Sequence, residues 1–344
     1  MFATQRPLTL AEMTAVLAPL GTPVAAEPLG GGTFSAVQLV KLADGKRLAV
    51  KTSVPDGEER PPLLTYECDL LRTERDLLRE LRDDPAVPVP DLLLEDFTRE
   101  HAPVDVIATE FLTSTPWSDL QETLPGEMNT QVGNSVGQIF AALQARTSGS
   151  FGYPANDFAL GASTWPEAFH AMLSSVLEDA NTWGVDVRAD DVRRVLDRGE
   201  AALAEVETPA LVHLDLWAGN VLLDPATATI TAILDWERAA YADPLIEFVG
   251  SESTIHGPTN PNLYAGYLKA GGTLPLDPDA GTLSGLTRAA DARTTLYRLY
   301  TVSIQQVEVV PRNFTGDWVP GHVAHLRSAR DQLLDYALAA LPAA

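Results

Sequence analysis

The sequence predicts an α+β fold of two lobes: an N-terminal antiparallel sheet with one helix, and a larger, mainly helical C-terminal lobe. Short apolar strand patterns separated by tight turns dominate the first part of the chain. Apolar stripes at helical spacing dominate the remainder. Short strands return only at 211–237, where polar residues stand at the strand ends. We therefore expect lobes of residues 1–113 and 114–344.

Composition and charge restrict the class of partner. The chain has 344 residues, 45% hydrophobic and 21% charged, which is typical of a folded globular protein. Its net charge of −23 disfavours nucleic acid or an anionic membrane as a partner. The same charge is compatible with a cationic small molecule as substrate. The alternative is that it keeps the protein soluble or reflects adaptation to a salt-rich host. The single Cys68 leaves no intrachain disulfide, and the lack of a long apolar run or signal-peptide pattern indicates a cytoplasmic protein.

The N-terminal lobe should begin with a helix over residues 8–20, capped by Thr9 with Glu12 completing a capping box. Strands are predicted at 24–29, 36–42 and 47–52, and the first two flank the glycine-rich stretch G-G-G-T-F-S. Backbone N–H groups of such a turn can approach a phosphate closely, although a plain hairpin turn is the alternative. The candidate phosphate-binding residues are Gly31, Gly32, Thr33 and Ser35.

Residues 63–81 form a strong helical pattern, with leucines on one face and charges on the other. Glu67 and Glu74 are seven residues apart and would share a face of this helix. Strands at 92–96 and 104–111 complete the sheet. Further helices are predicted at 127–147, 165–183, 189–206, 284–310 and 322–341.

The most specific pattern is H-x-D-x-x-x-x-N, formed by His213, Asp215 and Asn220 and followed by Asp235 at the end of an apolar strand. Phosphoryl transfer from ATP requires positioning, metal ions that neutralise phosphate charge, and a carboxylate beside the attacking hydroxyl. Asp215 would be that carboxylate, while Asn220 and Asp235 offer the oxygen ligands that Mg²⁺ prefers. The alternative is that Asp215 is a turn residue and Asp235 a helix cap.

The stretches HLDLWAGNVLLD and ILDWERAAYADPLIEF resemble the two central motifs of the aminoglycoside phosphotransferase (APH-like) branch of the protein-kinase-like fold. The resemblance implies that Asp215 is the catalytic base, that His213 supports its loop, and that Asn220 and Asp235 bind Mg²⁺. The sequence departs from the family pattern at Leu214, where many members have glycine, and at Glu247, where aspartate is usual. It also has no A-P-E segment, which argues against a protein kinase regulated by loop phosphorylation.

The resemblance also implies an ATP site in the N-terminal lobe. Lys51 would hold the α- and β-phosphates, and Glu74 would orient it, with Glu67 as the alternative; a solvent-facing lysine is the simpler interpretation. The backbone near Glu110 and Leu112 would contact the adenine edge. The C-terminal helices would form the acceptor pocket. The carboxylates that could face a cationic acceptor there are Asp157, Glu252, Asp291, Glu308 and Asp317, although each is more simply a surface charge.

We expect a phosphotransferase that uses ATP and Mg²⁺ to phosphorylate a hydroxyl of an aminoglycoside, peptide antibiotic or macrolide. One alternative is a metabolic kinase that acts on choline, an amino sugar, fructosamine or homoserine. A non-catalytic nucleotide-binding protein is disfavoured because Lys51, Asp215, Asn220 and Asp235 are all present. A metal-dependent hydrolase is disfavoured by the single histidine of the central segment and by Asn220.

Overall fold

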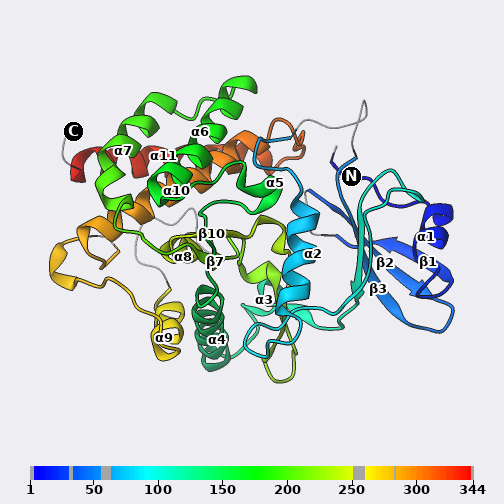
Figure 1. Ribbon diagram of the computed structural model, residues 1–344. Helices are drawn as coiled ribbons and strands as arrows, with labels where there is room; N and C mark the ends of the chain where they lie inside the picture. Colours follow the sequence, from blue (N-terminus) through cyan, green and yellow to red (C-terminus); the bar gives the residue numbers. More distant parts are fainter. Residues whose placement is uncertain (1–3, 31–33, 56–62, 251–259, 283, 342–344) are drawn as a thin grey trace.

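The computed structural model describes residues 4–30, 34–55, 63–250, 260–282 and 284–341. An antiparallel sheet lies at one end of the molecule and most of the helices at the other, with α2 between them (Figure 1). The predicted α+β class is therefore confirmed. The sheet has the strand order β1-β2-β3-β5-β4. Its strands are β1 (Pro23–Pro28), β2 (Ala36–Leu42), β3 (Arg47–Thr52), β4 (Leu92–Asp96) and β5 (Val106–Glu110).

Helix α1 (Leu10–Val16) covers one face of this sheet, and the predicted Thr9–Glu12 capping box is present. On β3, Leu48 and Val50 are buried in the cluster that contains α1. Side chains alternate between the two faces of a strand. Lys51 therefore points to the opposite face, toward α2 and the rest of the molecule.

Helix α2 (Leu70–Leu81) begins seven residues later than predicted. The residue before it, Asp69, has a left-handed backbone (φ 49°), which helical residues do not adopt. Glu67 precedes the helix, so the prediction that Glu67 and Glu74 share a helical face is wrong. Four buried leucines of α2 pack into the large core of the helical region: Leu71, Leu77, Leu78 and Leu81.

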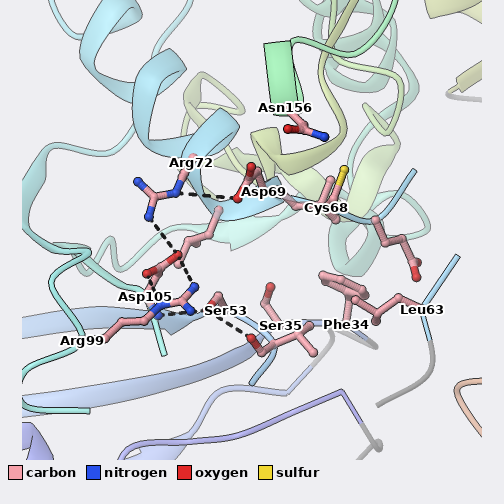
Figure 2. Close-up of a pocket in the computed structure, with 14 residues that line it drawn as sticks. Phe34, Ser35, Ser53, Leu63, Cys68, Asp69, Arg72, Arg99, Asp105 and Asn156 are labelled. Atoms are coloured by element: carbon pink, nitrogen blue, oxygen red, sulfur yellow. Dashed lines mark hydrogen bonds and ion pairs between the residues drawn. The ribbon is translucent and has the colours of Figure 1, made fainter. Parts of the chain in front are cut away.

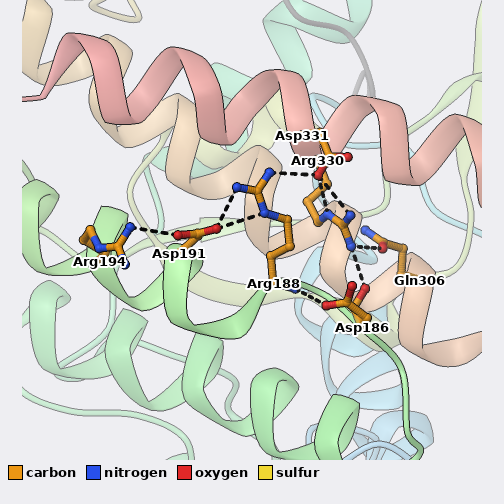
Figure 3. A network of polar contacts seen from close by, with 7 residues as sticks. All are labelled: Asp186, Arg188, Asp191, Arg194, Gln306, Arg330 and Asp331. Carbon is orange, nitrogen blue, oxygen red and sulfur yellow. Dashed lines mark hydrogen bonds and ion pairs between the residues drawn. The ribbon is translucent and has the colours of Figure 1, made fainter.

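The helical region is assembled around α10 (Arg288–Glu308), which contacts α6, α7, α8 and α11 and is buried along most of its length. Near the start of α7, Arg188 pairs with Asp191 and with Asp331 of α11 (Figure 3). Arg330 of α11 bonds Gln306 of α10 in the same network. The remaining helices are α3 (Trp117–Leu120), α4 (Gly126–Gln144), α5 (Ala155–Phe158), α6 (Trp165–Thr182), α7 (Ala189–Leu203), α8 (Leu245–Gly250), α9 (Pro261–Lys269) and α11 (Val319–Ala340).

Short strands frame the central segment. Strand β7 (Ala210–Val212) pairs with β10 (Ala240–Ala242), and β8 (Val221–Leu223) lies between β6 (Thr115–Pro116) and β9 (Ile230–Ile233). The backbone N–H of Ile233 donates to the carbonyl of Pro88 (2.8 Å), which joins this segment to the chain that follows α2. Within the described part of the chain, no helix has the length and apolar character needed to cross a membrane.

Candidate active site

The loop after β7 is held from within by His213, whose side chain is fully buried. One ring nitrogen lies 2.9 Å from the carbonyl of Leu234, and the other accepts the backbone N–H of Asp215 (3.2 Å). Burial lowers the pKa of His213 to about 4. The imidazole is therefore neutral at pH 7, and its contacts suit a residue that positions the loop.

Leu214 has a left-handed backbone (φ 64°), a conformation that costs a non-glycine residue about 1–2 kcal/mol. This conformation explains why glycine suits the position in the family that the sequence resembles. The buried carboxylate of Glu247 accepts the backbone N–H of His213 and stabilises the loop. Burial raises the pKa of Glu247 to about 7, while this hydrogen bond opposes the shift. The contact anchors the loop to α8 (Leu245–Gly250).

Asp215 lies in the same loop, in an environment that disfavours its charge. Burial raises the pKa of Asp215 to about 7, Arg238 opposes the shift, and Asp235 and Glu237 add to it. The side-chain amide of Asn220 donates to the backbone carbonyl of Asp215 (2.7 Å), which ties the two ends of the loop together. A carboxyl group that titrates near neutral pH is suited to accept a proton from a hydroxyl.

Lys51 is the centre of a buried ionic group. Its ammonium lies 2.6 Å from Glu74, 2.5 Å from Asp235 and 2.8 Å from Glu237. We call these four residues the lysine cluster. Burial acts to lower the pKa of Lys51, but the three carboxylates outweigh it and hold that pKa well above its usual value. The predicted pairing of Lys51 with Glu74 is present.

Glu237 was not given a role from the sequence. Besides Lys51, it accepts a hydrogen bond from the hydroxyl of Ser35 (3.0 Å), so it links the end of the glycine-rich turn to the central segment. The sequence feature that could have identified Glu237 is the tripeptide Asp235-Trp236-Glu237. Trp236 is completely buried, and the carboxylates on either side of it both reach Lys51.

Glu67, the alternative partner for Lys51, instead binds Arg312, which follows α10. Arg312 also pairs with Glu308 (2.9 Å), and Arg238 lies 3.5 Å from the same carboxylate. We call these four residues the arginine cluster. The guanidinium of Arg312 also lies over the ring of Phe34 (5.4 Å). The alternative assignment of Glu67 is therefore wrong, because its carboxylate is bound to a different cation.

The remaining predicted nucleotide-site residues lie as follows. Glu110 ends β5, and its backbone N–H donates to the carbonyl of Asp91 (3.0 Å). Leu112 follows two residues later, after the strand. Gly31, Gly32 and Thr33 lie outside the described residues.

Among the acidic residues considered for a cationic acceptor, Asp291 and Glu308 are buried and Asp157 and Asp317 are exposed; Glu252 lies outside the described residues. Asp291 accepts hydrogen bonds from Ser284 and Tyr336. Glu308 belongs to the arginine cluster. The two buried carboxylates thus already have partners within the protein.

A pocket of about 270 Å³ opens between the end of the glycine-rich turn, the end of β3 and the start of α2 (Figure 2). Ser35 and Cys68 line it. Asp105 also lines it, where it is bonded by Arg99 (2.8 Å) and lies 3.5 Å from Arg72. Its charged groups thus have partners within the protein, since Glu67, which also lines the pocket, is bound by Arg312.

The donor atoms near Lys51 fit a magnesium ion. Carboxylate oxygens of Glu74, Asp235 and Glu237 all lie within 4.8 Å of one another, and a cation, the Lys51 ammonium, already contacts all three. Mg²⁺ prefers hard oxygen ligands of this kind. Because the amide nitrogen of Asn220 bonds the Asp215 carbonyl, its amide oxygen can be offered to a cation.

A strand lysine paired with a helix glutamate, facing an H-x-D-x-x-x-x-N loop and a second aspartate, defines a kinase-like phosphotransferase. Comparison with known families agrees. The chain belongs to the phosphotransferase enzyme family, whose model matches residues 25–284, and it is a small-molecule phosphotransferase. No curated protein matches the sequence.

Solved structures share the fold. Aminoglycoside phosphotransferase APH(4)-Ia, in a complex with AMP-PNP and hygromycin B, has a TM-score of 0.64 and 18% identity over 95% of this chain and 98% of its own. A Thermobifida fusca protein assigned as a fructosamine-3-kinase has a TM-score of 0.63 and 22% identity over 96% and 98%. The GDP and kanamycin complex of APH(2")-IIIa has a TM-score of 0.55 and 15% identity over 96% and 99%. At these identities, the likeness establishes the fold.

Proposed function

We propose that this protein transfers the γ-phosphoryl group of ATP to a hydroxyl of an antibiotic of the aminoglycoside, peptide or macrolide type. The observation that carries the transfer from ATP is the lysine cluster, and the likeness to antibiotic phosphotransferases supports the choice of acceptor. The cluster brings Lys51 of the sheet, Glu74 of α2 and Asp235 of the central segment onto one ammonium. Residues 1–113 would supply most of the nucleotide contacts, and residues 114–344 the base and the acceptor pocket.

In this reaction, Lys51 holds the α- and β-phosphates and Glu74 keeps its ammonium in place. The acceptor oxygen forms a bond to the γ-phosphorus, the bond between that phosphorus and the β–γ bridging oxygen breaks, and ADP leaves. Asp215 takes the proton of the attacking hydroxyl. Asn220 and Asp235 would hold Mg²⁺, which supplies positive charge against the phosphates. Ser35 and the backbone of Gly31, Gly32 and Thr33 would contact the phosphates, and the backbone of Glu110 and Leu112 the adenine.

A metabolic kinase is the second candidate. It is favoured by the likeness to the protein assigned as a fructosamine-3-kinase, which shares 22% identity. The same catalytic groups would serve both reactions, so the acceptor alone distinguishes them. A non-catalytic role is opposed by the complete set of Lys51, Asp215, Asn220 and Asp235.

The test is phosphate transfer from ATP, followed by mass spectrometry, across aminoglycosides, macrolides, peptide antibiotics, amino sugars, fructosamines, choline and homoserine. Asp215→Asn should lower the rate about 10²- to 10⁴-fold, because the variant cannot accept the proton. It should still bind AMP-PNP. Asp190→Asn is the matched control, since that carboxylate is 95% exposed on α7. Normal turnover by Asp215→Asn would reject Asp215 as the base, and a phosphorylated metabolite without a phosphorylated antibiotic would select the second candidate.

A further inference from the structure

Trp217 is 47% exposed and lies two residues after Asp215. The backbone N–H of Trp217 donates to the carbonyl of Asp215 (3.1 Å), which closes a tight turn around Leu216. Leu216 is 1% exposed, so its side chain anchors the turn in the core. Asp215 and Trp217 directly flank this anchor, so the exposed indole lies within two residues of the proposed base.

One edge of the indole ring packs against its neighbour Gly219. A Cβ atom at Gly219 would lie 2.3 Å from two atoms of the six-membered ring of Trp217, so that ring packs directly against the glycine backbone. Any side chain at this position would displace the indole. The indole ring is therefore an exposed apolar surface near the base, with a conformation restricted by its packing. A side chain that is already restricted loses little conformational entropy when a ligand binds to it.

We propose that Trp217 is the platform on which the acceptor lies, and that the acceptor is a cyclic sugar, either an amino sugar or a glycoside. The inference rests on the proposed phosphotransfer, which brings a hydroxyl to Asp215. The part of the acceptor next to that hydroxyl then lies over the indole. An aromatic face attracts the apolar C–H face of a sugar ring and any ammonium group that it carries. An acyclic alcohol such as homoserine has no ring face to place there.

The experiment measures acceptor binding without turnover, by calorimetry on protein loaded with Mg²⁺ and AMP-PNP. The probes are kanamycin, hygromycin B and fructosyl-lysine, compared with choline and homoserine. Trp217→Ala should weaken the binding of a sugar probe about tenfold or more, and Trp217→Phe should retain most of the affinity. Trp318→Ala is the matched control, because Trp318 is 50% exposed at the start of α11. The affinity for AMP-PNP should be the same in all variants, which also shows that each one folds.

Unchanged sugar affinity in Trp217→Ala would overturn the inference. So would a wild-type protein that binds none of the sugar probes, or one that binds choline or homoserine more tightly than any of them. Sugar binding that depends on Trp217 but is not followed by phosphate transfer from ATP would reject the proposed function and leave the platform in place. The two proposals can therefore fail separately.

Discussion

Two buried ionic clusters join distant parts of this chain, and they differ in charge balance. The lysine cluster has one cation against three carboxylates, whereas the arginine cluster has two guanidinium groups against two carboxylates. A balanced buried cluster is complete in itself. An unbalanced one retains unneutralised negative charge in a region of low dielectric, which costs free energy unless another cation arrives. The difference indicates that the lysine cluster is prepared for a ligand and that the arginine cluster serves the structure.

The largest expected effect comes from removing one carboxylate of the lysine cluster. Asp235→Asn should lower phosphate transfer about 10³-fold, because the cluster loses an anionic ligand for Mg²⁺. Its free energy of unfolding should also fall, because Lys51 outweighs burial and holds the pKa of Asp235 below its usual value, so the charged carboxylate stabilises the fold. The fall should be smaller than in the arginine cluster, because Lys51 keeps two carboxylate partners. The rate of phosphate transfer measures the first effect, and denaturant unfolding of the same preparation measures the second. A normal rate of phosphate transfer by Asp235→Asn would reject Asp235 as a ligand of Mg²⁺.

The arginine cluster should respond mainly through stability rather than through activity. Arg312→Met leaves Glu67 buried without its cation, and it should lower the free energy of unfolding by about 3–5 kcal/mol. Added Mg²⁺ should not restore the loss. The control is Arg188→Met, since Arg188 is 33% exposed in its pair with Asp191 and should lose about 1 kcal/mol or less. Equal losses in the two variants, measured by denaturant unfolding, would remove the distinction between a buried cluster and a surface pair.

The smallest expected effect is a shift in the pH dependence of turnover, and one residue of each cluster contributes to it. Because Asp215 must be ionised to accept a proton, turnover should fall about tenfold per unit as the pH drops below about 7. Glu237→Gln should move this pH profile to lower pH and Arg238→Met to higher pH, since Glu237 raises the pKa of Asp215 and Arg238 lowers it. A profile that neither variant moves would assign the pH dependence to another group.

The same shift has a consequence for stability. The pKa of Asp215 is about 7 in the folded protein and 3.8 in its ordinary state, so its protonation favours folding. That stabilisation is fully present below pH 3.8 and is lost as the pH rises through 7. Asp215→Asn should therefore be more stable than the wild type above pH 7, with a difference that shrinks in acid.

The sequence predicted the fold class, most elements and the pairing of Lys51 with Glu74, because strand alternation, helical stripes and motif spacing are local signals. It could not predict that α2 begins at Leu70. The segment before α2 is fixed by the bond between Glu67 and Arg312, which are 245 residues apart. Glu237 was overlooked for the same reason, since its partner Ser35 is 202 residues away. Contacts at such separations leave no periodic pattern in the sequence.

The anchoring of the His213–Asp215 loop has a consequence for synthesis of the chain. Leu214 does not favour a left-handed backbone on its own, and the carboxylate that holds its loop belongs to Glu247 in α8. During translation, the loop emerges from the ribosome before α8 does. The loop cannot be fixed in its native shape until at least thirty-odd further residues have emerged, since Glu247 is 34 positions beyond His213. A nascent chain that stops short of α8 would therefore carry every polar residue of the motif without the geometry needed to use them.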